Sequence, residues 1–233
     1  MLFLSYSKIK IFQSCPRAYR YRYIDHVKPE FLPDYFILGE LVHQSVAKAE
    51  KEGEDVEIVY KKLSSEFDLK REHLVEGLSM VKNWKFWKAA RPKAEKVLSI
   101  ELPFELFSGD GVAFKGKIDR LSYHPEDDTF CIIDYKTGKS KTPRKRIKSS
   151  LQLGLYALAV KVWYGDDARA MASFLYLKDL DKRGIYVRDD VIHFAQDKLY
   201  EAYIKIKKET LFPRKKSWQC KLCQYKITCQ EDI

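Results

Sequence analysis

The spacing of apolar positions predicts a largely helical first part, a β-rich middle and a helical end. Residues 36–51 carry apolar side chains at helical intervals, at Leu38, Val42, Val46 and Ala49. Similar patterns predict further helices over residues 8–14, 16–23, 55–66, 69–90, 142–164 and 190–210. Ser5 or Ser7 can cap the first of these helices, and Pro16 suits the first turn of the second.

The middle of the chain follows the alternation that is typical of strands. Residues 96–107 and 112–123 flank a short glycine-containing segment, which predicts a hairpin. Residues 129–135 are almost continuously apolar, as in a strand buried on both faces. Two more strands are predicted at 169–177 and 184–188. This order indicates an α/β fold with a mixed central sheet flanked by helices.

Composition and charge narrow the class of protein. The chain has 233 residues, 45% of them apolar, and 43 basic against 33 acidic residues give a net charge of +10. We find no repeat, low-complexity tract or linker, which predicts a single compact domain. No apolar run is long enough for a membrane span, and the first residues do not resemble a secretory signal, so we expect a cytoplasmic protein without a membrane partner. The basic surplus makes acidic polymers plausible partners.

The strongest chemical signal is a pair of carboxylates beside a lysine. Side chains alternate along a strand, so Asp134 and Lys136 share one face at a strand end. The preceding strand places Asp119 within reach if the two strands pair. Two acids around Mg²⁺ or Mn²⁺ can activate water and neutralise charge on a phosphate. The alternative is a solvated ion pair at the end of a strand.

The segments GKIDR, IIDYKTGK and QLGLY together resemble the RecB-type branch of the PD-(D/E)XK nuclease superfamily. This resemblance implies the fold core of that superfamily and a metal-dependent DNA exonuclease. It also implies that Asp119 and Asp134 bind Mn or Mg and that Lys136 positions or deprotonates the attacking water. The backbone carbonyl of Tyr135 would be a further metal ligand.

Other motifs follow in the order of the same family. The segment Gly39–His43 is similar to the helix that carries its metal-binding histidine, so the resemblance implies His43 as a ligand that favours Mn²⁺. Glu101 falls where relatives of that family often carry another acid, so the resemblance adds it to the candidate residues. Gln152 and Tyr156 are four residues apart on a predicted helix, so they can reach the same target. They match the Q-x-x-x-Y motif of the family, which implies a role in orienting DNA and the surroundings of the lysine.

The cysteines form a second constellation. Cys220, Cys223 and Cys229 lie in one short segment, a spacing that zinc knuckles also use. A closed four-thiolate site needs a further cysteine, and both Cys15 and Cys131 are candidates. Cys131 lies in the buried strand, where a cysteine can act simply as a small apolar residue.

One early cysteine followed by a C-terminal trio resembles the iron–sulfur RecB-like exonucleases, which include the CRISPR-associated exonuclease family and AddB-type nuclease domains. The resemblance implies that Cys15, Cys220, Cys223 and Cys229 hold a [4Fe-4S] cluster, with zinc as the alternative. We therefore expect a helical part over 1–92, a nuclease core over 93–210 and a cluster segment over 211–233 that packs on the N-terminal helices.

Basic residues follow the proposed site directly. The segment 136–148 contains no acid, and it contributes five candidate DNA-binding residues: Lys139, Lys141, Arg144, Lys145 and Arg146. Alternating tyrosines and arginines over 19–23 could also stack on bases of a single strand. Either run could instead be an ordinary solvated face.

The resemblance implies single-stranded DNA ends as substrate, with an integrase or a helicase as a possible partner protein and a role in spacer acquisition, an antiviral defence. The alternatives are end processing in phage or repair recombination, and a catalytically weak DNA-binding subunit of a larger complex.

Overall fold

The computed structural model describes residues 1–231, so the last two residues of the expected cluster segment lie outside the described part. The chain divides into two compact units. Unit 1 comprises residues 1–33, 106–115 and the residues from 197 onward, and unit 2 comprises residues 34–105 and 116–196. These units differ from the expected division at residues 92 and 210, because the chain passes repeatedly from one unit to the other.

A mixed sheet forms the centre of unit 2, as the sequence predicts. Its strands lie in β2 (Lys96–Ser108), β3 (Val112–His124), β4 (Thr129–Lys136), β5 (Ala170–Tyr176) and β6 (Asp181–Tyr186). β2 pairs with β3, and β3 with β4 in antiparallel orientation. β4 and β5 are parallel, whereas β5 and β6 are antiparallel. The parallel pair requires a crossover, and a helix between the two strands supplies it.

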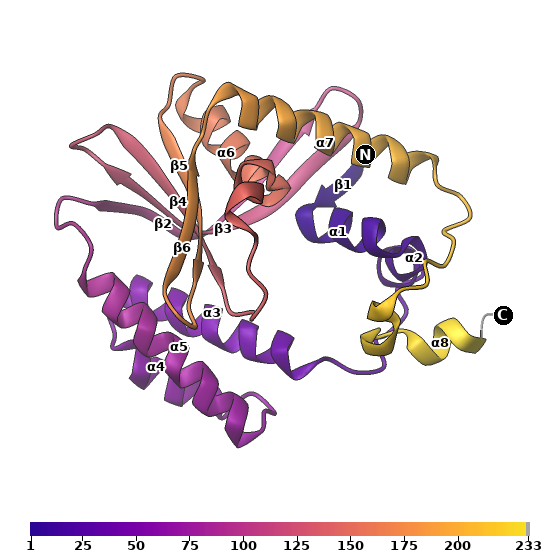
Figure 1. The fold of residues 1–233 in the computed structure, drawn as a ribbon, viewed down its shortest axis with the longest axis horizontal. Coiled ribbons are helices and arrows are strands. Elements are labelled where there is room, and N and C mark those ends of the chain that lie inside the picture. The colour runs from indigo at the N-terminus through magenta and orange to yellow at the C-terminus, as the bar shows by residue number, and fades with distance from the viewer. Residues whose placement is uncertain (232–233) are drawn as a thin grey trace. The chain divides into compact units, whose positions relative to one another are not determined.

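Helices cover both faces of this sheet (Figure 1). They are α3 (Asp34–Glu52), α4 (Val56–Ser64), α5 (Arg71–Ala89), the 3-10 helix η1 (Arg144–Ser149), α6 (Leu151–Tyr164) and the start of α7 (Asp189–Lys208). Apolar side chains of α3, α4 and α5 pack with Ile133 and Tyr135 of β4 in one core. The even-numbered residues of β4 consequently point toward α6, so this alternation sets Asp134 and Lys136 on the α6 face.

Unit 1 joins the two ends of the chain. It contains β1 (Leu2–Ser5), α1 (Tyr6–Ser14), α2 (Pro16–Tyr23), the 3-10 helix η2 (Trp218–Leu222) and α8 (Lys226–Glu231). β1 pairs in parallel with residues 112–115 of β3. Arg17 donates hydrogen bonds to the carbonyls of Phe212 and Pro213, and Ser14 Oγ donates to Gln219. The C-terminal segment therefore packs on the N-terminal helices.

Two local predictions are wrong, and one strand was not predicted. The helix expected over 142–164 is divided, because Ser150 has extended backbone angles and its side chain caps Leu153 at the start of α6. β6 begins three residues and ends two residues earlier than expected, since its register pairs Asp181 with Tyr176. β1 was not predicted, because four residues carry little periodic signal. Within the described residues, we find no helix both long and apolar enough to cross a membrane.

Candidate functional site

The end of β4 carries two of the proposed site residues. Asp134 is 3% exposed, and its Oδ2 lies 2.7 Å from Nζ of the half-buried Lys136. Continuing the antiparallel register of β3 and β4 by one residue sets Asp119 opposite Asp134. Here Asp119 Oδ2 accepts a hydrogen bond of 2.7 Å from the backbone N–H of Tyr135. The two acids thus come from neighbouring strands and lie at the same end of the sheet.

His43, Glu101 and Asp119 form a group that can hold a metal ion. One ligand atom from each lies within 4.8 Å of the others, and His43 Nδ1 lies 3.5 Å from Asp119 Oδ2. Glu101 has a φ of 57°, a left-handed conformation that costs a non-glycine residue about 1 kcal/mol or more. Glu101 also forms an ion pair with Lys117 of β3. An imidazole and two carboxylates match the ligand preferences of a divalent ion such as Mn²⁺.

The electrostatics of this group also fit a cation. Burial raises the pKa of Asp119 to about 7, and the Asp134 and Glu101 carboxylates act in the same direction. His43 and the N–H of Tyr135 partly oppose this effect on the Asp119 pKa by favouring its charged form. Several carboxylates therefore lie together in a buried site, where water screens their mutual repulsion poorly. A bound divalent ion would relieve their repulsion.

Two side chains of α6 connect the acid and the lysine of β4. Gln152 Nε2 donates to Asp134 Oδ1 at 2.6 Å, and Gln152 Oε1 accepts from Lys136 Nζ at 2.8 Å. The hydroxyl of Tyr156 donates to the same Asp134 oxygen at 3.3 Å and accepts from Gln152 at 2.9 Å. Burial raises the pKa of Tyr156 well above its ordinary value, so this phenol stays a donor. Both side chains of the Q-x-x-x-Y motif reach one carboxylate.

Behind Tyr156 lies an aromatic support that sequence reasoning missed. The Phe104 ring of β2 contacts the Tyr156 ring edge to face, with 5.8 Å between centroids. Phe104 lies so close to Gly116 that a Cβ on this glycine would be 2.3 Å from the ring. A glycine inside a strand pattern often marks such a close approach, and this was the available signal.

A buried ion network fixes α3 against β3. The Arg120 side chain is 2% exposed and lies 2.9 Å from both Glu50 of α3 and Glu95. Glu50 follows His43 by seven residues, or about two helical turns. Arg120 follows Asp119 directly in β3. The network therefore ties the helix that carries His43 to the strand that carries Asp119, another contact that the sequence did not reveal.

Four of the five cysteines gather in unit 1. Burial raises the pKa of the Cys223 thiol, and the nearby thiols of Cys15, Cys229 and Cys220 add to this effect. Cys131 lies in β4 of unit 2 and is 5% exposed. Of the two candidates for a fourth ligand, the structure brings Cys15 to the C-terminal trio.

The spacing of these thiols bears on what they could hold. A zinc ion with thiolates at about 2.3 Å sets the sulfur atoms about 3.8 Å apart. Within residues 1–231, no three of the cysteine sulfurs lie within 4.8 Å of one another. The described sulfurs therefore lie farther apart, as a set, than the ligands of a closed zinc site.

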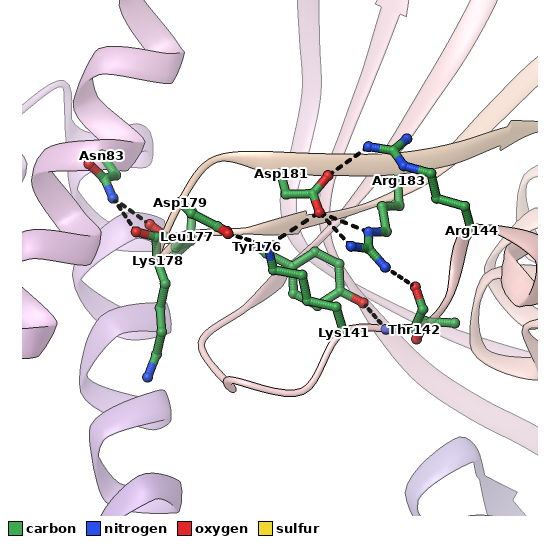
Figure 2. A network of polar contacts seen from close by, with 10 residues as sticks. All are labelled: Asn83, Lys141, Thr142, Arg144, Tyr176, Leu177, Lys178, Asp179, Asp181 and Arg183. Carbon is green, nitrogen blue, oxygen red and sulfur yellow. Dashed lines mark hydrogen bonds and ion pairs between the residues drawn. The ribbon is translucent and has the colours of Figure 1, made fainter.

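The structure divides the candidate DNA-binding residues into two sets. Lys139, Lys145 and Arg146 are exposed. Lys141 instead forms ion pairs with Asp179 and Asp181, and Arg144 Nη2 lies 3.0 Å from Asp181 (Figure 2). The second set therefore holds the loop in place through acidic partners that the sequence prediction did not identify.

The same network anchors the loop that follows Lys136. Thr142 donates its backbone N–H to the Tyr176 hydroxyl at 2.7 Å, and Arg183 Nη1 donates to the Thr142 carbonyl at 2.5 Å (Figure 2). Arg183 also binds Asp181 through Nε at 2.9 Å. Asp181 is thus the common partner of Lys141, Arg144 and Arg183. Its pKa is lowered, and the hydrogen bonds from Arg183 are the main cause.

Replacing Asp181 with asparagine is expected to weaken binding of a single DNA strand, the ligand that the basic segment predicts, several-fold, although it removes a negative charge. Simple Coulomb attraction predicts the opposite, tighter binding, because the loop becomes more positive. Without Asp181 the loop should lose its common anchor. Ordering the loop when DNA binds would then cost more conformational entropy. Fluorescence anisotropy of a labelled single strand measures the affinity, with the exposed Asp167→Asn as the charge-matched control. Tighter binding by Asp181→Asn would show that the anchor has no role.

The idea that tyrosines over 19–23 stack on bases is wrong for two of the three rings. Tyr19 is 4% exposed and stacks on Phe212, with the ring planes 3° apart. Tyr21 is 3% exposed and packs against Tyr225. On a helix, residues that alternate in sequence point to different sides. Here the rings of Tyr19 and Tyr21 are both buried in unit 1.

Comparisons with known proteins bear on the family of the chain and on its fold. The family model of the PD-(D/E)XK nuclease superfamily matches residues 3–230. A crystal structure from Eubacterium rectale, of a protein described provisionally as an exonuclease, has a TM-score of 0.59 at 16% identity, covering 99% of this chain and 88% of the other. The crystal structure of a protein named SSO0001 has a TM-score of 0.40 at 13% identity, with coverage of 99% and 87%. The search of curated proteins finds no significant match.

Proposed function

Because the chain belongs to the PD-(D/E)XK nuclease superfamily, we propose that it is a metal-dependent DNA exonuclease that acts on single-stranded ends or overhangs. His43, Glu101, Asp119 and Asp134 would hold Mn²⁺ or Mg²⁺, with the Tyr135 carbonyl as a further ligand. The single observation that carries this proposal is the convergence of His43, Glu101 and Asp119 within 4.8 Å beside the Asp134–Lys136 pair.

The residues of the site would divide the reaction between them. The reaction forms a bond from a water oxygen to phosphorus as a bridging P–O bond breaks. The divalent ion would neutralise charge on the phosphate and increase the acidity of the water. Lys136, fixed by Asp134 and Gln152, would position the attacking water or help to deprotonate it. Tyr156 and Gln152 would keep Asp134 oriented toward the ion.

An end-labelled DNA assay tests this function. Linear single strands, linear duplexes and circular single strands are incubated with Mn²⁺, with Mg²⁺ and with chelator. We expect metal-dependent release of short products from linear single strands, and little cleavage of circles. Equal cleavage of circular and linear strands would contradict an exonuclease, and cleavage in chelator would contradict the metal requirement.

For unit 1 we propose a [4Fe-4S] cluster held by Cys15, Cys220, Cys223 and Cys229. The proximity of Cys15 to the other three thiols supports this assignment. Joining residue 15 to residue 220 closes a loop of about 205 residues, which removes much chain entropy from the unfolded state. The cluster would thus stabilise the packing of the C-terminal segment on α1 and α2.

Cys15→Ala is expected to lower the iron content of anaerobically purified protein to near zero and to lower the thermal midpoint by several degrees. The reason is that a cluster with three thiolates lacks one protein ligand, and the loop is no longer closed. Cys131→Ala is the matched control and should keep its iron, because Cys131 lies in the other unit. Stoichiometric zinc without iron in the unaltered protein would contradict the cluster.

The cysteine layout also supports a biological setting. Its resemblance to CRISPR-associated exonucleases makes spacer acquisition our proposed role, with an integrase as the expected partner. Purification from the native cell tests this, since recovery of an integrase would support the role. Recovery of a helicase instead would favour the processing of recombination ends.

A further inference from the structure

Two large aromatic side chains stand exposed at the start of α3. The exposed fractions are 57% for Tyr35 and 52% for Phe36, and their ring centroids lie 4.5 Å apart with the planes tilted by 34°. The following turns of the helix bury Leu38, Leu41 and Val42 in the core of unit 2. The two rings are therefore outside the core and form one continuous apolar surface.

This surface continues the face of α3 that carries a proposed metal ligand. Phe36 precedes His43 by seven residues, which is close to two full turns and about 10 Å along the helix axis. Gly39 lies between them on the same side, and a Cβ there would be 3.1 Å from Thr137 Oγ1. Thr137 follows Lys136 directly. The path from Phe36 to His43 therefore passes the end of β4.

The start of α3 also contacts α5, which lies near a cation of the segment 136–148. Asp34 pairs with His73 of α5 at 3.2 Å. The pKa of Glu76, one turn further along α5, is lowered mainly by Lys178 and also by Lys139 and His73. Lys139 of the segment 136–148 therefore lies near α5, the helix whose His73 also contacts Asp34. Exposed rings beside a basic segment are the combination that single-strand-binding proteins use, with cations for the phosphates and rings for the bases.

We propose that Tyr35 and Phe36 form a stacking platform for the bases of a single DNA strand whose scissile phosphate lies at the His43–Asp119 site. This inference rests on the proposed function. At a stacked spacing of about 3.4 Å per nucleotide, the platform lies about three nucleotides from the cleaved bond. Base faces are covered in a duplex, so the platform gives the site a preference for single strands.

The test combines a protein change with a substrate change. Phe36→Ala, Tyr35→Ala and Phe36→Trp are compared with the unaltered protein on a linear single strand and on strands with abasic nucleotides at positions two to four from either end. The matched control is Phe86→Ala, because Phe86 is 71% exposed on α5. Thermal midpoints show that each variant is folded.

On the normal strand we expect Phe36→Ala to raise KM about tenfold with little change in kcat, since stacking on one ring is lost. Abasic nucleotides should raise KM of the unaltered protein similarly, and should have little further effect on Phe36→Ala. Phe36→Trp should stay close to the unaltered protein. The platform would be overturned if Phe36→Ala left KM unchanged, or if Phe36→Ala and the abasic nucleotides raised KM independently of each other. The exposed rings would then be better explained as a contact for a protein partner.

Binding without divalent metal separates this inference from the proposed function. Fluorescence anisotropy with the same oligonucleotides should show the same loss of affinity in Phe36→Ala, and no loss in Phe86→Ala. If the unaltered protein does not cleave DNA but binding follows this pattern, the proposed function fails and the platform stands. If cleavage occurs but the affinity is the same for normal and abasic strands, the platform alone is wrong.

Discussion

Replacing Lys136 with alanine is expected to slow metal-dependent DNA cleavage by about a thousandfold. A positioned group that transfers or holds a proton contributes about a hundredfold to ten-thousandfold. Lys136 Nζ lies 2.7 Å from Asp134 Oδ2 and 2.8 Å from Gln152 Oε1, so its position is well defined. Lys136→Arg keeps the charge but cannot release a proton, so partial activity in that variant would indicate an electrostatic role.

The alanine variant should fold normally, because Gln152 and Asp134 remain bonded to each other at 2.6 Å. Single-turnover cleavage of an end-labelled strand measures the loss, and circular dichroism checks the fold. The exposed Lys62→Ala is the control for the loss of one positive charge. A Lys136→Ala variant that keeps a tenth of the activity would remove this lysine from the mechanism.

Asp119→Asn is expected to abolish cleavage while raising the thermal stability of the metal-free protein at pH 8. Activity is lost because an amide is a weak ligand for a divalent ion. Stability rises because the pKa of Asp119, about 7 in the folded protein, lies above the ordinary value of 3.8. A raised carboxyl pKa means that the fold is destabilised as this group ionises.

The sign of the pH dependence follows from these two values. Well below pH 4 the carboxyl is protonated in both states, and this group then costs the fold no stability. As pH rises from about 4 to 7, the unfolded state releases this proton first, so the folded state loses stability. Above pH 7 the loss is complete. The variant lacks this titration, so its thermal midpoint should exceed that of the unaltered protein by a few degrees at pH 8.

Thermal unfolding at pH 4, 6 and 8 in chelator tests this pH dependence. The side-chain oxygen of asparagine can still accept the Tyr135 N–H, which keeps the packing comparable. Saturating Mn²⁺ should reverse the order, because an ion that binds the folded state stabilises only the protein that binds it. A variant with a lower thermal midpoint than the unaltered protein at pH 8 in chelator would show that the Asp119 charge does not destabilise the fold.

Periodicity and short motifs predicted the parts of the structure that depend on neighbours in sequence. The hairpin of β2 and β3, the buried strand β4 and the mixed sheet follow from alternation and turn residues. The spacing of Gln152 and Tyr156 also anticipated that both reach one target. Such features depend on local geometry, which follows directly from the spacing of residues in the sequence.

Features that depend on distant contacts were not predictable. The Phe104 ring over Gly116, the Arg120 network and the Asp181 anchor each join residues from separate elements. Tyr19 and Tyr21 looked available for bases only because their partners, Phe212 and Tyr225, lie about 200 residues away. The same distance explains why the sequence left two candidates for the fourth cysteine, and why the structure brings Cys15 to the trio.

The most direct test of the central claim is the rate of nucleotide release from a linear single strand at saturating Mn²⁺, measured for the unaltered protein and for Asp134→Asn. We expect the unaltered protein to release short products only when the metal is present. The variant should be slower by at least about a hundredfold, with the same circular dichroism spectrum. Equal rates for both proteins, or release that persists in chelator, would contradict a metal-dependent site built on Asp134.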